Sequence, residues 1–592
     1  MNRTAALLSL CLLLLVVWSL TLAGLSQSFE FDKEVLDKPV LLFVLLQIAA
    51  GGVYLLTVWL LQHRPASMFW LTLVLLAGLV MRVSQFGSLP VLETDPYRYL
   101  WDGAVTAAGY NPYAISPHQV RYEPQTLPQP LQTLATQAGV IIERINHPTL
   151  RTIYPPITQG AFALAHWIKP FSMDGLRWTW LVLDFVIAGL LILLLRKLAA
   201  QTLLTGIGIY WLNPLLIKEV YNSGHMELVL VAAMLLVLFT AINQRTVLSL
   251  LMLGLAILAK VWPILWLPLL LRMPASSNRH RLVGVGLMLA MGALLLWPVL
   301  AGRLDGDSGF VAYTGRWQMN DSVHQLLYQF FIPWLPDQAR LLARLIIITI
   351  LLLLLTRCIF RFNTNNTSTW LLESTLTITT ALFLLSPTQF PWYWLWLLPL
   401  LALVPLWSLL AFTLTLPVYY LYLPLHALGQ TVWFDRGLVW LQFVPIWMLL
   451  FFELRNRRRQ AHSARTLTPV NFNPSASLKV AVIIPTLNEE AAIAQVIDAI
   501  PNWVTQIIVA DNGSTDRTPV IAQQHGAMVV HEPQRGYGAA CLAGMSALQN
   551  PDVVVFLDGD FSDHPEEMGR LIVADCLRRC RPCHRLSCHW RS

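Results

Sequence analysis

Two groups of carboxylates in this chain are spaced so that they could bind a metal ion or take up a proton. Asp558 and Asp560 follow a short apolar run in VVVFLDGDFSD (553–563). Hard carboxylate oxygens at the end of such a run suit Mg²⁺ or Mn²⁺. Glu93, Asp95 and Asp102 lie in ETDPYRYLWDG (93–103), shortly after another apolar run. A carboxylate in this second group could take the proton of a hydroxyl, as a general base does.

Other polar residues between apolar runs could complete a site with the second group. Ionisable residues at membrane depth are costly, so a functional role is the first hypothesis and interhelical hydrogen bonding the alternative. We expect Lys218, Lys260 and Arg316 to contact phosphate. His225 and His324 lack the tight spacing of metal ligands, so hydrogen bonding is favoured for both. The sequence does not decide whether this site binds a metal. The candidate substrate-binding residues are Arg98, Tyr154, Lys218, Glu219, Asn222, His225, Lys260, Arg316, Asn320, Asp321, Trp392 and Tyr393.

The composition predicts that most of the chain lies in a membrane. Of its 592 residues, 56% are hydrophobic and only 12% are charged, against about 25% charged in ordinary soluble domains. We expect residues 1–455 to form a polytopic helical domain of about 11 to 14 transmembrane helices, with an uncleaved first helix. The basic residues behind the net charge of +7 cluster at loop ends. Such clusters set the orientation of membrane helices, so we expect no nucleic-acid partner. These clusters put the loop 89–156 outside.

The pattern changes after a basic and polar linker at 456–477. Short β-branched runs at 480–484, 506–510, 527–530 and 553–557 alternate with helical stretches. Such alternation predicts the first half of a parallel, Rossmann-like α/β sheet over residues 478–571. The tail 572–592 loses this pattern. Its cysteines (Cys576, Cys580, Cys583 and Cys588) suggest a zinc site, but a shifted reading frame is the favoured interpretation.

Four motifs in order make the C-terminal region similar to family-two glycosyltransferases of the GT-A type, and closest to polyprenyl-phosphate mannose or glucose synthases. They are VIIPTLNEE, VADNGSTDRT, EPQRGYGAACLAGM and FLDGDFSDHPEEM. The resemblance implies a GDP- or UDP-linked sugar, and Mg²⁺ or Mn²⁺ held by Asp558 and Asp560. The nucleotide-sugar-binding residues that it implies are Pro485, Thr486, Asn488, Glu489, Asp511, Gly513, Arg535, Gly536 and Asp558. In that family the sheet continues after the Asp-x-Asp strand and supplies an acceptor-side carboxylate. We therefore expect this domain to be truncated and weakly folded or inactive.

The loop 89–156 resembles the first external loop of GT-C glycosyltransferases, in the bacterial mannosyltransferase-like branch. The resemblance is carried by DPYRYLWDG with a downstream NPY, and Glu93-Thr94-Asp95 fits the paired-acid motif of that family. It implies transfer of a hexose, mannose first, from a polyprenyl-phosphate sugar to an external glycan, lipid or protein. Asp95 would be the base, with Glu93 assisting. The plasma membrane of a prokaryote is the expected location, and a flippase or a non-catalytic tether is the alternative function.

Overall fold

The computed structural model describes residues 3–64, 67–274, 277–302, 304–362, 366–466, 478–569, 572 and 586–589. Side chains at 314–316, 460–466 and 586–589 are not described, so the side chain of Arg316 lies outside the described residues. The same holds for residues 467–477 of the predicted linker and for the side chains of the four tail cysteines. The chain divides into two compact units, Met1–Leu454 and Arg455–Ser592.

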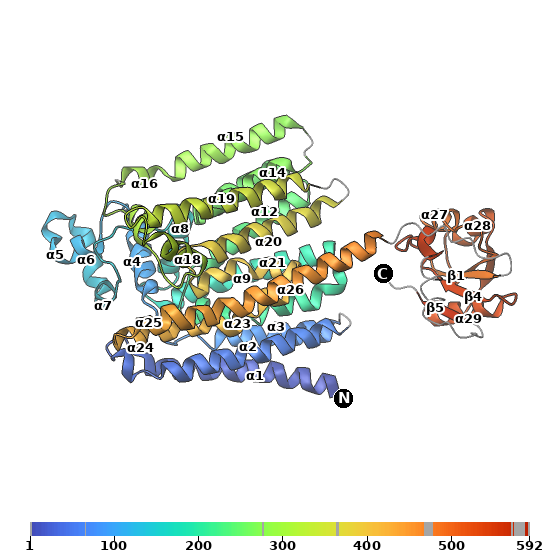
Figure 1. The fold of residues 1–592 in the computed structure, drawn as a ribbon, viewed down its shortest axis with the longest axis horizontal. Helices are drawn as coiled ribbons and strands as arrows, with labels where there is room; N and C mark the ends of the chain where they lie inside the picture. Colours follow the sequence, from blue (N-terminus) through green and yellow to red (C-terminus); the bar gives the residue numbers. More distant parts are fainter. Residues whose placement is uncertain are drawn as a thin grey trace. The chain divides into compact units, whose positions relative to one another are not determined.

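The first unit is a helical bundle suited to a membrane (Figure 1). Eight helical segments among the described residues are long and apolar enough to cross a bilayer: Arg3–Phe29, Val40–Gln62, Met173–Leu198, Asn278–Ala301, Ala339–Phe360, Thr367–Leu385, Trp407–Ala427 and Thr431–Arg459. Shorter apolar segments are Met68–Val83, Glu227–Ile242, Thr246–Ala259, Trp262–Arg272 and Pro391–Leu403. The polytopic helical fold is therefore confirmed. The predicted 11 to 14 helices are reached only when the shorter segments are counted with the eight long ones.

The α-helices of these segments, and those that lie between the segments, have the following bounds. The first group is α1 (Arg3–Ser26), α2 (Val40–Gln62), α3 (Met68–Val83), α9 (Met173–Leu198), α10 (Leu203–Trp211), α11 (Pro214–Leu216), α12 (Glu227–Ile242), α13 (Thr246–Ala259), α14 (Leu267–Arg272), α15 (Asn278–Leu295) and α16 (Trp297–Ala301). The second group is α17 (Gly309–Arg316), α18 (Val323–Phe331), α19 (Ala339–Phe360), α20 (Thr367–Leu385), α21 (Leu398–Leu403), α22 (Trp407–Leu410), α23 (Phe412–Thr415), α24 (Tyr422–Ala427), α25 (Thr431–Trp433) and α26 (Val439–Thr466).

Several helices of the bundle are interrupted, and some of these interruptions bring polar groups into the bundle. Lys260 and Pro263 interrupt the apolar run 247–271, which predicts two short helices that meet at a polar kink. This prediction is confirmed: α13 ends at Ala259, Lys260 is extended, and the 3-10 helix η6 (Trp262–Trp266) follows with Pro263 in its first turn. A second break falls around Pro405, between α21 and α22. Between α11 and α12 the chain forms a π-helix, η5 (Ile217–Asn222), whose side chains are all buried. Wide helical turns of this kind often mark functional sites.

A buried ion pair joins α3 to α9. Arg82 donates from Nε to Asp184 at 2.6 Å, and both side chains are fully buried. The hydroxyls of Tyr210 and Tyr221 donate to the same carboxylate at 2.6 and 2.8 Å. The Arg82 guanidinium also lies 3.6 Å from the ring centroid of Trp211. Every charge here has a close partner, which is the condition for an ion pair to be tolerated in an apolar core.

Four short helices follow α3 and gather at one end of the bundle (Figure 1). They are α4 (Asp95–Ala107), α5 (Pro117–Tyr122), α6 (Gln129–Ala138) and α7 (Val140–Glu143). About half of the predicted loop 89–156 is thus helical. Helix α4 packs against α8 (Pro156–Ile168), where Gly103 allows close approach: a Cβ there would lie 2.4 Å from the Phe162 carbonyl oxygen.

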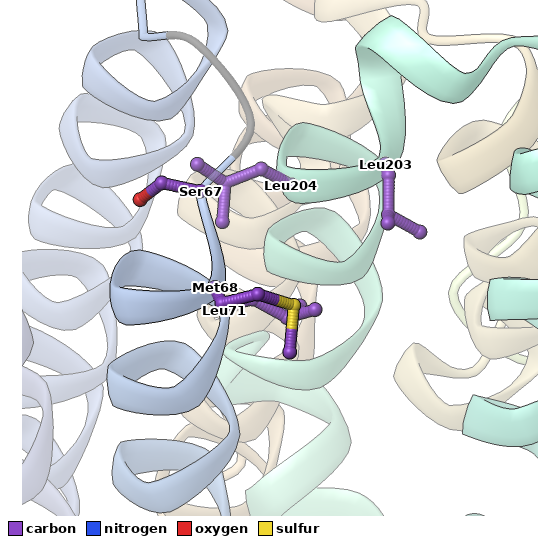
Figure 2. Close-up of a pocket in the computed structure, with 5 residues that line it drawn as sticks. All are labelled: Ser67, Met68, Leu71, Leu203 and Leu204. Carbon is purple, nitrogen blue, oxygen red and sulfur yellow. The ribbon is translucent and has the colours of Figure 1, made fainter.

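A small apolar pocket lies at the other end of α3. Its lining residues are Ser67, Met68, Leu71, Leu203 and Leu204, and Figure 2 shows them at the starts of α3 and α10. The 16 residues of α3 span about 24 Å, which separates this pocket from the acidic residues that follow the helix. Ser67 supplies the lone polar side chain among the lining residues, and it accepts a hydrogen bond from the Trp70 amide at 3.4 Å. The pocket is therefore apolar apart from one hydroxyl.

The second unit contains the predicted parallel sheet. Its strands are β1 (Val480–Thr486), β2 (Gln506–Asp511), β3 (Met528–His531), β4 (Val553–Phe556) and β5 (Leu586–His589), in the order β3-β2-β1-β4-β5. Every described strand pair is parallel. Helices α27 (Ile493–Asp498), α28 (Thr518–Gln524) and α29 (Tyr537–Ser546) connect the strands. Alternate residues of β1 enter two separate cores, with Val482 in one and Ile483 in the other. Both faces of the sheet are therefore apolar, as expected of a parallel sheet.

Candidate active site

Helix α4 presents Asp95 at its first residue. Pro96 follows in the first turn, where a proline and an acidic side chain both favour a helix start. The Asp95 carboxylate accepts a hydrogen bond from Asn146 Nδ2 at 2.8 Å and lies 3.5 Å from the Tyr99 hydroxyl, one turn along α4. The Tyr99 ring stacks on Phe162 of α8, with 4.6 Å between the centroids. Asp95 is thus oriented by two polar side chains.

Glu93 lies in a buried cluster with a lysine, a second glutamate and a tyrosine. Its Oε1 is 2.9 Å from the Tyr420 hydroxyl and 3.6 Å from Lys218 Nζ. The same hydroxyl is 2.9 Å from Glu219 Oε1, and Lys218 Nζ is 3.2 Å from Glu219 Oε2. Lys218 Nζ also contacts the Tyr420 hydroxyl. Because a tyrosine hydroxyl has one hydrogen, Tyr420 can donate to one glutamate at a time. One ammonium and one hydroxyl thus hold two buried carboxylates together.

His225 connects this cluster to Asp95. Its Nε2 lies 3.5 Å from Glu93 Oε2, and its Nδ1 lies 3.4 Å from the Tyr99 hydroxyl. The imidazole stacks on Trp392, with centroids 4.0 Å apart and planes 14° apart. Because Tyr99 also faces Asp95, two of the three predicted catalytic acids, Glu93 and Asp95, belong to one continuous polar network.

Lys260 forms the neighbouring ion pair. Its Nζ lies 3.0 Å from Glu227 Oε1 and 3.9 Å from the ring centroid of Tyr393. Glu227 begins α12, two residues after His225, so the pair adjoins the network. The Lys260 side chain is 19% exposed, whereas that of Lys218 is 1% exposed. Lys260 is therefore the more accessible of the two ammonium groups.

In the second unit, three strand ends meet at one edge of the parallel sheet. Asp511 ends β2, is 3% exposed, and accepts a hydrogen bond from the Ser514 amide at 3.2 Å. The side chain of Asn488, after β1, accepts from the Thr515 amide at 2.7 Å. Gly513 lies between them with a φ of +83°, which glycine adopts readily. These bonds fix the two loops at the edge where such sheets bind ligands.

Asp558 and Asp560 lie at the same edge, after β4, and both are exposed. The glycine between them packs on the loop after β1: a Cβ at Gly559 would lie 2.8 Å from Thr486 Cγ2 and 3.3 Å from Glu489 Cγ. Burial raises the pKa of Glu489, and the Asp560, Asp516 and Asp558 carboxylates raise it further. Oxygen donors crowded in this way fit the Mg²⁺ or Mn²⁺ that the sequence predicts for Asp558 and Asp560.

Arg535 and Gly536 precede α29 and are both exposed. The Gly536 amide donates to Asn512 Oδ1 at 2.6 Å, and the Asn512 amide group donates to the Glu532 and Gln534 carbonyls. This loop is therefore held against the end of β2.

Comparison with known proteins finds a family match for part of each unit. Residues 9–276 match the family described as "Alpha-(1->6)-mannopyranosyltransferase, N-terminal domain". Residues 481–574 match the family described as "Glycosyl transferase family 2". Two parts of this chain are thus similar to glycosyltransferase families.

Relatives of the family 2 region come from bacteria and archaea. An uncharacterized glycosyltransferase of Mycobacterium tuberculosis is 42% identical over 93 residues, which are 16% of this chain and 42% of that protein. The low-salt glycan biosynthesis hexosyltransferase Agl6 of Haloferax volcanii is 37% identical over 103 residues, 16% of this chain and 24% of that protein. The chain thus spans about two-fifths of the first relative and less of the second.

A solved structure is also similar to this region in sequence. It is the crystal structure of glucosyl-3-phosphoglycerate synthase from Mycobacterium tuberculosis in complex with Mn²⁺, UDP and glucosyl-3-phosphoglycerate. The identity is 38%, the match covers 15% of this chain and 37% of that one, and the TM-score is 0.14.

Within the mannopyranosyltransferase-family region, Arg98 and Asp102 pair with each other. Arg98 Nε lies 3.0 Å from Asp102 Oδ1, and Arg98 also donates to the Leu150 carbonyl at 2.8 Å. Gln159 Nε2 lies 3.4 Å from the other Asp102 oxygen. The predicted catalytic role of Asp102 stays a prediction, but both of its oxygens are engaged. Tyr154 packs edge-on against Tyr99 with centroids 5.0 Å apart, and so borders the network.

Three further predicted residues have partners outside the network. Asn222 accepts from the Val91 amide and donates to the Leu89 carbonyl, both at 3.0 Å, so it fixes the chain just before Glu93. Asn320 Nδ2 donates to the Gln389 carbonyl at 2.9 Å. Asp321 lies 2.7 Å from His324 Nδ1. These bonds hold the three residues and their partners in place in the fold. The predicted contacts of the three residues with substrate stay predictions.

Burial shapes the electrostatics of the membrane site. It raises the pKa of Glu93, against the attraction of Lys218. It also raises the pKa of Asp102, against Arg98. Burial lowers the pKa of His225, although Glu219 raises it. The imidazole is therefore biased towards its neutral form, which keeps a nitrogen lone pair.

Three residues of the site were missed in the sequence: Tyr99, Asn146 and Tyr420. Tyr99 could have been found because it lies one helical turn from Asp95. Tyr420 lies 327 positions from Glu93, inside an apolar run and outside residues 9–276. No local pattern marks it.

Proposed function

We propose that the membrane region transfers a hexose, with mannose favoured, from a polyprenyl-phosphate sugar to an external glycan, lipid or protein. The observation that carries this proposal is the orientation of Asp95 by Asn146 and Tyr99, inside the part of the chain that matches the mannopyranosyltransferase family.

In this proposal Asp95 takes the proton of the acceptor hydroxyl. The hydroxyl oxygen then bonds to the anomeric carbon from the side opposite the phosphate, the bond from that carbon to the phosphate oxygen breaks, and polyprenyl phosphate leaves. Lys260, the more exposed ammonium, would contact the departing phosphate. Glu93 would orient the network around Asp95. Trp392 and Tyr393 would border the sugar.

We place this site on the external face of a prokaryotic plasma membrane. Arg196 and Lys197 lie in the last turn of α9, and Arg279 lies in the first turn of α15. Arg455 to Arg459 lie at the end of the apolar segment Thr431–Arg459. The positive-inside rule puts these basic helix ends in the cytoplasm, together with the C-terminal unit.

For the C-terminal unit we propose binding of a GDP- or UDP-linked sugar. The loops after β1 and β2 would hold the nucleotide, with Asp511 at their base. Arg535 and Gly536 would approach the diphosphate. Asp558 and Asp560 would hold Mg²⁺ or Mn²⁺, whose chemistry when bound is to neutralise charge on the diphosphate.

Sugar transfer in liposomes tests the main proposal. Purified protein receives synthetic polyprenyl-phosphate mannose and an acceptor glycan, and product is measured for Asp95→Asn and for Glu123→Gln, an exposed acid of the same loop. Loss of a general base lowers the rate by about 10²- to 10⁴-fold, so Asp95→Asn should lose turnover while Glu123→Gln retains it. Equal turnover of the two variants would overturn the role of Asp95. Movement of the lipid across the bilayer without transfer would favour a flippase.

A further inference from the structure

Three side chains in the buried network converge as metal ligands do. Glu93, Glu219 and His225 each offer one ligand atom, and these atoms lie within 4.8 Å of one another. They come from separate segments: the turn before α4, the π-helix η5 and the turn before α12. Their side chains are 8%, 0% and 1% exposed. Burial of this degree removes the water that would otherwise solvate the carboxylates.

The histidine supplies an independent indication of a ligand. His225 Nε2 is buried and makes no hydrogen bond within the described part of the chain. It faces Glu93 Oε2 at 3.5 Å and Glu219 Oε2 at 3.8 Å. Charge-assisted hydrogen bonds are shorter, at about 2.7 to 2.9 Å. Ligands on a tetrahedral ion with bonds of about 2.1 Å would stand about 3.4 Å apart. The separations therefore suit a shared ion better than direct hydrogen bonds.

The other ring nitrogen is placed as in a metal-bound histidine. His225 Nδ1 lies 3.4 Å from the Tyr99 hydroxyl, which lies 3.5 Å from Asp95 Oδ2. A hydrogen on Nδ1 would point to Tyr99, and the Tyr99 hydrogen to Asp95. Nε2 would then keep its lone pair towards the two glutamates. Metal-bound histidines commonly donate their second nitrogen to a polar group in this manner.

The network has more negative than positive charges, which also favours the binding of a cation. Four carboxylates (Glu93, Asp95, Glu219 and Glu227) adjoin two ammonium groups (Lys218 and Lys260), which leaves an excess of two negative charges when all are ionised. Lys218 contacts Glu93 through Oε1, whereas His225 faces Oε2. The lysine thus leaves one oxygen of Glu93 for another cation. Uncompensated buried charge is strongly unfavourable.

We propose that Glu93, Glu219 and His225 form a binding site for a divalent transition-metal ion. Imidazole with two carboxylates suits Mn²⁺ or Zn²⁺ better than Mg²⁺, which prefers oxygen ligands alone. Three protein ligands leave a coordination position open. Where the proposed function also holds, a phosphate oxygen of the lipid donor would take that position beside Asp95. Ion binding itself does not depend on that function.

Binding of Mn²⁺ and of Zn²⁺ alone, without donor or acceptor, tests the site. The full-length protein carries Asp558→Ala and Asp560→Ala so that the C-terminal carboxylates do not contribute, and it is stripped with a chelator in detergent. We expect one ion per chain, measured by calorimetry, and a nitrogen coupling to bound Mn²⁺ in pulsed electron paramagnetic resonance. His225→Ala should remove that coupling and weaken binding at least ~100-fold. Tyr99→Phe should weaken it by about 10- to 100-fold while keeping the coupling.

His324→Ala is the matched control, because His324 is also buried with an Nε2 that lacks a hydrogen-bond partner among the described residues. It should bind the ion as the parent does. If His225→Ala does not fold, Glu219→Gln replaces it and should weaken binding while keeping the coupling. A folded parent that binds no ion, or a coupling that survives His225→Ala, would overturn the proposal. A protein that binds the ion but transfers no sugar would refute only the proposed function.

Discussion

The hydroxyl of Tyr420 offers a sharp test of the buried network. It lies 2.9 Å from Glu93 Oε1 and 2.9 Å from Glu219 Oε1, and it also contacts Lys218. Tyr420→Phe removes only this oxygen. The ring can stay in its edge-on contact with Phe43, at 5.4 Å between centroids. The substitution therefore separates the polar contribution of Tyr420 from its packing.

The expected loss follows from the charge of the partners. A hydrogen bond to a charged group contributes about 1.5 to 3 kcal/mol, and about 1.4 kcal/mol corresponds to a factor of ten. If Glu93 must be held in place during transfer, Tyr420→Phe should lower kcat/KM by about 10- to 150-fold.

The assay is sugar transfer in liposomes at several donor concentrations, with thermal unfolding measured on the same preparations. Tyr419→Phe is the control, because its hydroxyl is in no hydrogen bond within the described ranges and its ring neighbours are aromatic. It should stay within about threefold of the parent, which corresponds to less than 1 kcal/mol. Full activity of Tyr420→Phe in a folded protein would refute the reasoning that the network positions Glu93 for transfer.

Three further predictions concern the fold and the C-terminal unit. Asp184→Asn should lower the free energy of unfolding by about 3 to 5 kcal/mol, because Arg82 would remain buried without its carboxylate; unfolding in detergent measures this, and an unchanged midpoint would contradict it. Asp558→Asn with Asp560→Asn should abolish binding of GDP-mannose or UDP-glucose in calorimetry, and a chelator should do the same to the parent; binding that survives both would refute the metal assignment. Gly559→Ala should weaken nucleotide binding by about 1 to 3 kcal/mol, because its Cβ would meet Thr486 at 2.8 Å; unaltered affinity would show that the loop gives way.

The sequence predicted those features that depend on local pattern. The break at Lys260 followed from a lysine and a proline in an apolar run. Strands β1 and β2 followed from the β-branched runs 480–484 and 506–510, and the structure extends them to Thr486 and Asp511. The proximity of Glu93, Glu219 and His225 could not be read in this way, because it depends on how three distant segments pack. Asp102 is close to the other acids in the sequence, and this closeness suggested a shared site. In the fold its carboxylate pairs with Arg98.

The ion pair between Arg82 and Asp184 has a consequence for how the protein is made. Asp184 lies near the middle of α9, and a lone aspartate at the centre of a membrane helix costs about 2.5 to 3.5 kcal/mol on insertion. Its partner lies on α3, which is synthesised about a hundred residues earlier. Helix α9 therefore gains its full stability in the bilayer once α3 is beside it. Early helices would have to remain near the insertion machinery until α9 emerges, so this pair couples the order of synthesis to the assembly of the bundle.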